Sequence, residues 1–216
     1  MFAGKSFFQI LAMGGWTLYL LLFISIISIS VIILKIIEFS RKSNIDITEL
    51  LKRVKNTLVK KGNIEGFIGY CLLLDCPVSN IIAAGLKKYM ETGNPDIEQA
   101  MKRKISIEVL KLERYTTILA TVGAVSVYIG LFGTVLGIIR SFHDISLAGS
   151  GGISVVIGGV SESLIATAAG LSVAIPAVVA FNFLSRSIDK FIIEMEYVVS
   201  ALKEIMSELG NKQNVG

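Results

Sequence analysis

Three long apolar stretches alternate with charged segments along the chain. They cover residues 14–34, 115–139 and 153–184. Each is long enough to cross a membrane, because about 20 apolar residues in a helix span the ~30 Å hydrocarbon core of a bilayer. Trp16 at the start of the first stretch and Lys35 at its end are residues typical of the membrane interface. The pattern predicts an all-α integral membrane protein with three transmembrane helices.

The remaining segments differ from these stretches in polarity. Residues 1–13 are mostly apolar but short, which predicts an N-terminal interfacial helix. Residues 35–114 contain 15 of the 21 Lys and Arg and predict a polar helical insertion, whereas 140–152 predict a short loop. Residues 185–216 predict a charged amphipathic helix, because their apolar positions recur at helical spacing. Long helices are therefore expected to extend from the membrane.

Turn and cap residues divide the insertion into helices. Asp46 or Thr48 can cap a helix that ends before Gly62. A second helix is expected over residues 77–92, and Gly93 should end it.

From Asp96 to Phe142 the sequence favours a helix and contains no proline, which predicts one very long helix. Its first part would be an amphipathic stalk, and its second part would be the second span.

Lys and Arg are distributed unequally on the two sides of the three predicted spans. Lys5 and Arg140 fall on one side, and the remaining 19 of the 21 fall on the other. Basic residues mark the cytoplasmic side. The N-terminus is therefore expected outside and the C-terminus in the cytoplasm.

The composition narrows the classes of function. The chain is 53% hydrophobic and 18% charged, with a mean hydropathy of +0.69, as is usual for a membrane protein. Its net charge of +4 does not predict nucleic-acid binding, because the basic residues flank the spans and are not interleaved with aromatic residues. A group of basic residues fits either contact with anionic lipid or a solvated helix face: Lys52, Arg53, Lys55, Lys60 and Lys61.

Metal, cofactor and enzyme chemistry are not indicated. Cys71 and Cys76 have no histidine near them in the sequence, so they are interpreted as buried small apolar residues. His143, the only histidine, fits an interfacial polar residue, with a proton relay as the alternative. No nucleophile paired with a base and no phosphate-binding loop is recognisable, so we expect neither an enzyme nor a bound cofactor.

Glu162 is the one ionisable side chain between Ile153 and Ser185. A carboxylate inside a span is costly and usually faces a helix-bundle interior or a water-filled path. Glu162 is therefore a candidate proton or ion site. The alternative is an interfacial residue wetted from outside, because Glu162 lies about 20 residues before Asn182, which is itself near the other end of the span.

Small residues crowd the second and third spans. Helices in a membrane pack closely where such residues form a face. Two faces on the third span predict two helical neighbours, and Pro176 predicts a kink, because it leaves the Ser172 carbonyl without a helical donor. The expected packing glycines are Gly130, Gly133, Gly137, Gly159 and Gly170.

Two motifs give the chain a resemblance to a known family. Residues 130–142 read GLFGTVLGIIRSF, and after a glycine-rich turn the third span contains SESLIATAAG at 161–170 and AIPA at 174–177. The chain thereby resembles the MotA/TolQ/ExbB proton-channel family, in its ExbB/TolQ branch. It departs from the pattern at Val127 and Gly158, where the family often has proline.

The resemblance implies a bacterial inner-membrane subunit that couples the proton motive force to work at the outer membrane, such as TonB-dependent uptake. It implies a homopentamer, ExbD- or TolR-like single-span subunits in a central pore, and a TonB- or TolA-like partner. By motif, Thr134, Glu162 and Thr167 match the family's polar pore residues.

Other functions are left open by the residues. Within the family, a TolQ-type subunit for envelope constriction and a MotA-like motor stator are the alternatives. Outside it, a structural membrane scaffold would explain the small-residue packing without any role for Glu162. A secondary transporter is disfavoured, because three spans show no inverted repeat.

Overall fold

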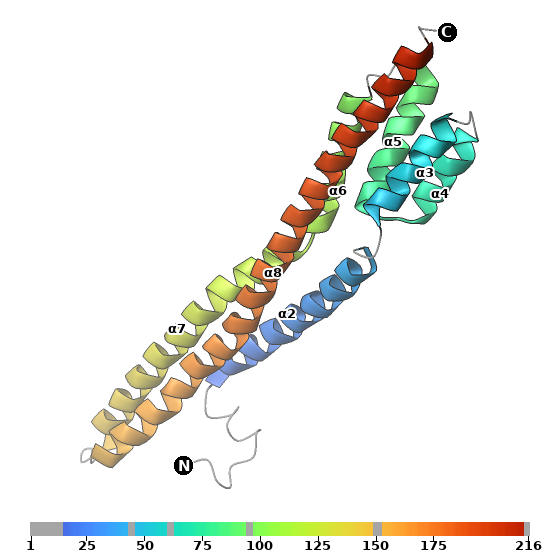
Figure 1. The fold of residues 1–216 in the computed structure, drawn as a ribbon. Helices are drawn as coiled ribbons and strands as arrows, with labels where there is room; N and C mark the ends of the chain where they lie inside the picture. The colour runs from blue at the N-terminus through green and yellow to red at the C-terminus, as the bar shows by residue number, and fades with distance from the viewer. Residues whose placement is uncertain (1–14, 43–45, 60–62, 94–96, 149–152, 214–216) are drawn as a thin grey trace. The chain divides into compact units, whose positions relative to one another are not determined.

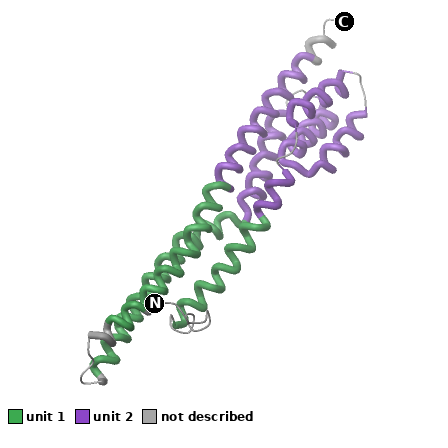
Figure 2. The backbone as a smooth tube through the Cα atoms, turned by 60° about the horizontal axis from the view of Figure 1, so that its bottom comes forward, with its two compact units in different colours: residues 1–34, 115–183 green, residues 35–114, 184–216 purple. Residues whose placement is uncertain are grey.

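A computed structural model describes residues 15–42, 46–59, 63–93, 97–148 and 153–213. The predicted N-terminal helix over 1–13 lies outside the described residues. The chain divides into two compact units, which Figure 2 colours separately. We call residues 1–34 and 115–183 the span unit, and residues 35–114 and 184–216 the polar unit.

Within these described ranges, three helices are long and apolar enough to cross a membrane. They are α2 (Gly15–Lys42), α7 (Thr116–Ala148) and α8 (Ile153–Gln213), which Figure 1 labels. All secondary structure in the described ranges is helical. The predicted fold class, an all-α membrane protein with three spanning helices, is confirmed.

Helix α7 ends at Ala148, six residues after the Phe142 end that the sequence predicts.

Four shorter helices belong to the polar unit. They are α3 (Ile47–Val59), α4 (Ile64–Leu73), α5 (Pro77–Thr92) and α6 (Glu98–Glu113). Helix α4 was not predicted, because its apolar residues follow no clear helical period and it contains two glycines, Gly66 and Gly69. In the structure it is capped by Asn63, whose side chain accepts a hydrogen bond from the Gly66 amide at 2.8 Å.

The predicted helix boundaries around α3 and α5 have identifiable caps. Asp46, one of the two predicted caps, accepts from the Thr48 amide at 2.9 Å. Helix α5 begins with Pro77 and ends before Gly93, whose φ of 63° satisfies the left-handed cap. Cys76 is an unexpected cap of α5, because its Sγ accepts a hydrogen bond from the Ser79 amide at 3.2 Å.

The core of the polar unit forms where α5 meets α6 and α8. Gly85 makes this approach possible, because a Cβ there would lie 2.8 Å from Met101 Sδ and 3.1 Å from a Leu202 methyl group. Both cysteines are buried, as predicted. The largest fully buried side chains of this unit are Val54, Ile81, Ile82, Leu86, Ile97, Met101, Leu112, Leu184, Met195 and Leu202.

The prediction of one continuous helix from Asp96 to Phe142 was wrong. Helix α6 ends at Glu113, and α7 begins at Thr116. Between them Arg114 has ψ of 128°, and Tyr115 has φ of 71°, a left-handed conformation that is uncommon for a residue other than glycine.

A buried lysine distant in the sequence contacts the end of α6. Lys35 Nζ donates to the Leu112 carbonyl at 3.0 Å and to Glu38 Oε2 at 2.8 Å. In an uninterrupted helix the Thr116 amide would bond that carbonyl, so Lys35 replaces a donor lost at the break. The ammonium also lies 5.7 Å from the centre of the Phe39 ring.

Candidate functional site

The candidate site lies in the span unit, where α7 and α8 run antiparallel along a face of small residues. A Cβ on Gly130 would lie 2.8 Å from the Ala166 carbonyl oxygen, and one on Gly170 would lie 3.0 Å from the Gly130 Cα. Gly137 faces Ser163 and Gly159 faces Ser141 in the same register. The backbones approach along the whole face because these positions lack bulky side chains.

The N-terminal end of helix α2 packs against this face. A Cβ on Gly133 would lie 2.7 Å from the Ala166 methyl group and 2.9 Å from Thr17 Oγ1. Thr17 is buried, so α2 contributes a hydroxyl to the interior of the span unit. On the outer side of these helices, Trp16 and Phe132 form an edge contact with ring centroids 6.4 Å apart.

The two predicted threonines come to the same level of the α7–α8 pair. Thr167 Oγ1 donates to the Gly130 carbonyl of α7 at 3.3 Å. Thr134 is only 7% exposed, and its Oγ1 donates to the Leu131 carbonyl one turn earlier at 2.6 Å. The antiparallel register places Thr134 opposite Ala166, the residue before Thr167.

The position of Glu162 is defined by the α8 backbone, but its side chain lies outside the described residues. Position 162 lies one turn before Ala166, on the helix that carries Thr167. With a rise of 1.5 Å per residue, the Glu162 and Thr167 backbones are about 7.5 Å apart along the axis. The backbone of residue 162 therefore lies within about two helical turns of both threonines.

Further buried hydroxyls occupy the same interior. Ser163 Oγ donates to the Val160 carbonyl and Ser141 Oγ to the Gly137 carbonyl, each at 2.8 Å. Ser126 Oγ is buried and lacks a hydrogen-bond partner among the described residues. The sequence showed these serines only as small packing residues. Helical spacing is the signal that could have found them. Ser126 and Ser141 lie eight and seven residues from Thr134, and Ser163 lies four residues from Thr167, so each shares a helix face with a threonine.

The packing glycines contact helices of their own chain. The small-residue faces of the second and third spans could also have packed against neighbouring subunits, but the structure uses them between α7, α8 and α2. These faces therefore give no separate reason to expect a ring. Pro176 lies inside α8, which continues through it, and its side chain is exposed.

The loop end of the span unit carries a different polar pair. His143 Nδ1 lies 3.8 Å from Asp144 Oδ1, and both side chains are exposed at the end of α7. The described part of the chain holds no group of three His, Cys, Asp or Glu side chains arranged as metal ligands.

In the described part of the chain, the fold and site together define a membrane protein in which three apolar helices pack through small residues and buried hydroxyls. Comparison with known families identifies the class further. A model of the MotA/TolQ/ExbB proton channel family matches residues 74–197. The match covers more than half of the chain, and the chain belongs to this family. The predicted class, a proton-channel family member and not an enzyme, is confirmed.

Individual relatives come from both named branches. TolQ of the Tol-Pal system from Pseudomonas aeruginosa is 44% identical over 124 residues, covering 52% of this chain and 54% of that protein. The biopolymer transport protein ExbB of Xanthomonas campestris is 48% identical over 90 residues, covering 42% of this chain and 36% of its own. The chain thus spans about half or less of these two relatives.

A longer match is found with ExbB of Neisseria meningitidis serogroup A. It is 32% identical over 182 residues, covering 77% of this chain and 80% of that protein.

Proposed function

We propose that the chain is an ExbB-like subunit that lets protons cross the inner membrane and uses their energy for work at the outer membrane. The observation that supports this most is that Glu162, the only acidic residue in the spans, lies on α8 with its backbone within about two turns of Thr134 and Thr167. A carboxyl can take up and release a proton, and hydroxyls can both donate and accept hydrogen bonds. Such groups form proton relays inside membrane proteins.

The energy available to this site comes from the membrane potential. Each proton that crosses supplies about 2.3 kcal/mol per 100 mV. The proposal assigns Glu162 the proton-binding role and assigns the two threonines the role of holding water or the proton along the path. Family resemblance carries the assignment of these three residues, and the structure supports it by bringing the threonines together.

The proposed complex contains several copies of the chain and a different partner. We propose a homopentamer that encloses ExbD- or TolR-like single-span subunits and acts on a TonB- or TolA-like protein. Exposed apolar residues on the spans are available for lipid or for helices of other subunits, among them Tyr128, Leu131, Ile139, Leu164, Ile175 and Val179.

A TolQ-type role is the second candidate. The Pseudomonas TolQ match is 44% identical over 124 residues, against 32% over 182 for the Neisseria ExbB match. Deletion of the gene separates the two functions: loss of energised uptake supports the ExbB role, and defective envelope constriction supports the TolQ role.

The test of the proton site replaces Glu162 by Gln, which keeps the size and hydrogen-bonding capacity but removes the titratable proton. We expect the Glu162→Gln complex to assemble, and proton flux into liposomes, followed with an internal pH-sensitive dye, to be abolished. Thr134→Val and Thr167→Val should reduce flux less, because each leaves the carboxyl in place.

Asp144→Asn is the matched control, since it removes an exposed carboxylate at the end of α7. Flux through the Asp144→Asn complex should equal that of the unmodified protein. Unchanged flux through a fully assembled Glu162→Gln complex would rule out the proposed site and favour a structural scaffold.

A further inference from the structure

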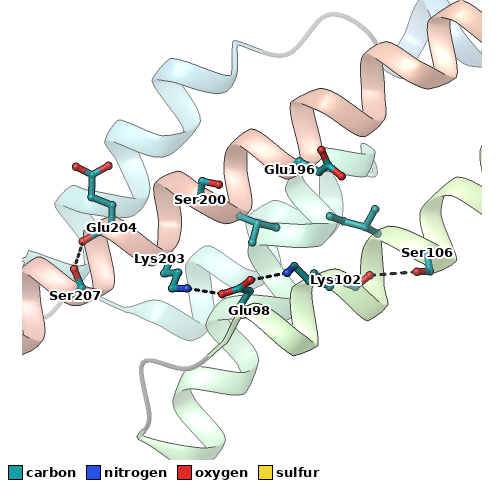
Figure 3. Close-up of a pocket in the computed structure, with 10 residues that line it drawn as sticks. Glu98, Lys102, Ser106, Glu196, Ser200, Lys203, Glu204 and Ser207 are labelled. Carbon is teal, nitrogen blue, oxygen red and sulfur yellow. Dashed lines mark hydrogen bonds and ion pairs between the residues drawn. The ribbon is translucent and has the colours of Figure 1, made fainter.

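An open groove of about 870 Å³ lies in the polar unit between α6 and the C-terminal part of α8 (Figure 3). Ile105 of α6 and Val199 of α8 give it an apolar part, and charged and hydroxyl side chains surround them. None of these residues belongs to the proposed proton site. A groove of this kind fits an amphipathic segment better than a small polar molecule.

Of the three carboxylates that line the groove, only Glu98 forms ion pairs within the described residues. Glu98 accepts from Lys102 at 2.6 Å and from Lys203 at 2.5 Å, as Figure 3 shows, so one carboxylate holds both lysines. Glu196 and Glu204 also line the groove, and neither forms an ion pair within the described part of the chain. The groove therefore offers two carboxylates to a cationic ligand.

The chain itself exposes a segment with matching chemistry on another side of α6. Arg103, Ile107 and Leu110 follow one another at spacings of four and three residues, so they form one stripe. This stripe lies about 120° around the helix from the groove residues. Ile107 is 49% exposed and Leu110 is 68% exposed, although they belong to a highly charged helix.

We propose that the groove of one copy receives the Arg103–Ile107–Leu110 stripe of α6 from a second copy. The inference rests on the proposed assembly of several copies and adds the surfaces that meet in it. The groove and the stripe are different surfaces, so the contact is head-to-tail. Repeated from copy to copy, such a contact forms a closed ring when the rotations between neighbours add up to a full turn.

The register of the helices agrees with this contact. A Cβ on Gly85 would touch both Met101 of α6 and Leu202 of α8, so these two residues lie at about the same height on the antiparallel helices. In a ring around an axis along these helices, every copy sits at the same height. Arg103 of the neighbouring copy then lies level with Ser200, about 6 Å along the axis from each of Glu196 and Glu204.

The apolar part of the stripe meets apolar residues at the same heights. Counting along the helices, Ile107 of the neighbouring copy falls level with Glu196, next to Tyr197, and Leu110 falls level with Ile193. Tyr197 is 58% exposed and Ile193 is 67% exposed, on the face of α8 that continues the groove. One contact would bury all four exposed apolar side chains and supply a cation to the two carboxylates.

Disulfide cross-linking between two differently tagged full-length chains tests the contact in the membrane. One chain carries Arg103→Cys and the other Ser200→Cys, both in a Cys71→Ala, Cys76→Ser background. We expect oxidation to give a dimer bearing both tags. Lys52→Cys in place of Arg103→Cys is the matched control, an exposed basic position on α3 that should give little dimer.

Native mass spectrometry distinguishes failure of the contact from failure of the assembly. An intact oligomer without the two-tag dimer would overturn the groove contact and leave the assembly standing. A monomeric unmodified chain would overturn both.

Charge exchange is an independent test. Arg103→Glu and Glu204→Arg should each lower cross-linking between Leu110→Cys and Ile193→Cys about tenfold, because each places like charges together. The two reversals combined should restore it. Cross-linking that is unchanged in both single variants, or that the combination does not restore, would overturn the proposal and point to a different protein as the ligand of the groove.

Discussion

At the scale of single residues, Lys35 shows how one buried charge can define a chain junction. Its side chain is buried, and its ammonium is shared between a carboxylate and the last turn of α6. A buried ammonium is stable only where hydrogen bonds and an opposite charge compensate for lost water. Glu38 and the Leu112 carbonyl provide this compensation, so the α6 end and the α2 end depend on each other.

Replacing Lys35 by Met keeps the apolar stem but removes the donor to the Leu112 carbonyl. We expect a loss of about 1–3 kcal/mol in the free energy of unfolding, the usual cost of leaving a buried acceptor without a partner. The thermal midpoint of the detergent-solubilised protein, followed by circular dichroism, measures it.

Lys42→Met is the matched control, because Lys42 binds the same Glu38 at 2.7 Å but is more exposed. It should cost less than Lys35→Met. Equal midpoints for the two variants would contradict the capping role of Lys35.

At the scale of elements, the α7–α8 contact depends on where side chains are absent. Lipid removes the hydrophobic drive between membrane helices, so close packing and hydrogen bonds hold them together. Gly130 and Gly170 bring the two backbones into direct contact, and this approach allows Thr167 to bond a carbonyl of α7. The packing of the helices and the geometry of the candidate site are therefore coupled.

Gly170→Ala should weaken this contact. The new methyl group would lie 2.6 Å from the Ser126 carbonyl oxygen, a backbone atom that cannot move away without shifting α7. We expect destabilisation of about 1–3 kcal/mol, as for other overpacked sites. A lower thermal midpoint, accompanied by reduced proton flux, would show both effects.

Gly158→Ala on the same helix serves as the control, because a Cβ there meets no atom within 4 Å. It should be neutral or stabilising by up to about 1 kcal/mol, since alanine favours a helix more than glycine does. A midpoint lowered as much by Gly158→Ala as by Gly170→Ala would mean that contact with α7 is not the cause.

At the scale of the whole molecule, the distribution of charge predicts how the chain crosses the membrane. Nineteen of the 21 Lys and Arg lie on the side of the membrane that residues 35–114 and 185–216 share, and two lie on the other side. Basic residues are enriched on the cytoplasmic side of membrane proteins. We propose that the polar unit is cytoplasmic and the N-terminus periplasmic.

Single cysteines at Ala3 and Ser150, in a Cys71→Ala, Cys76→Ser background, test this arrangement. Both should react with a membrane-impermeant thiol reagent added to intact spheroplasts. Ser207→Cys, at an exposed position of the polar unit, should react only after permeabilisation. Labelling in the reverse order would overturn the predicted orientation.

The candidate site was only partly predictable. Glu162 stands out because charge inside a span is rare, and Thr134 and Thr167 were found through the family motifs. Thr17 was missed, because nothing in α2 alone indicates that this threonine lies against Gly133 of α7. The serines were missed because a small polar side chain in a membrane helix fits packing and proton transfer equally well.

The sequence by itself determined the three spanning helices, the family and the isolation of Glu162. Span hydropathy and charge are properties of local segments, so they can be read without knowing which helices touch. The tertiary structure decided that the glycine faces meet within one chain, and it placed the break at Arg114 and Tyr115. Neither glycine nor proline marks that break. The donor that bonds the end of α6 is Lys35, 77 residues earlier in the chain, and only folding brings it there.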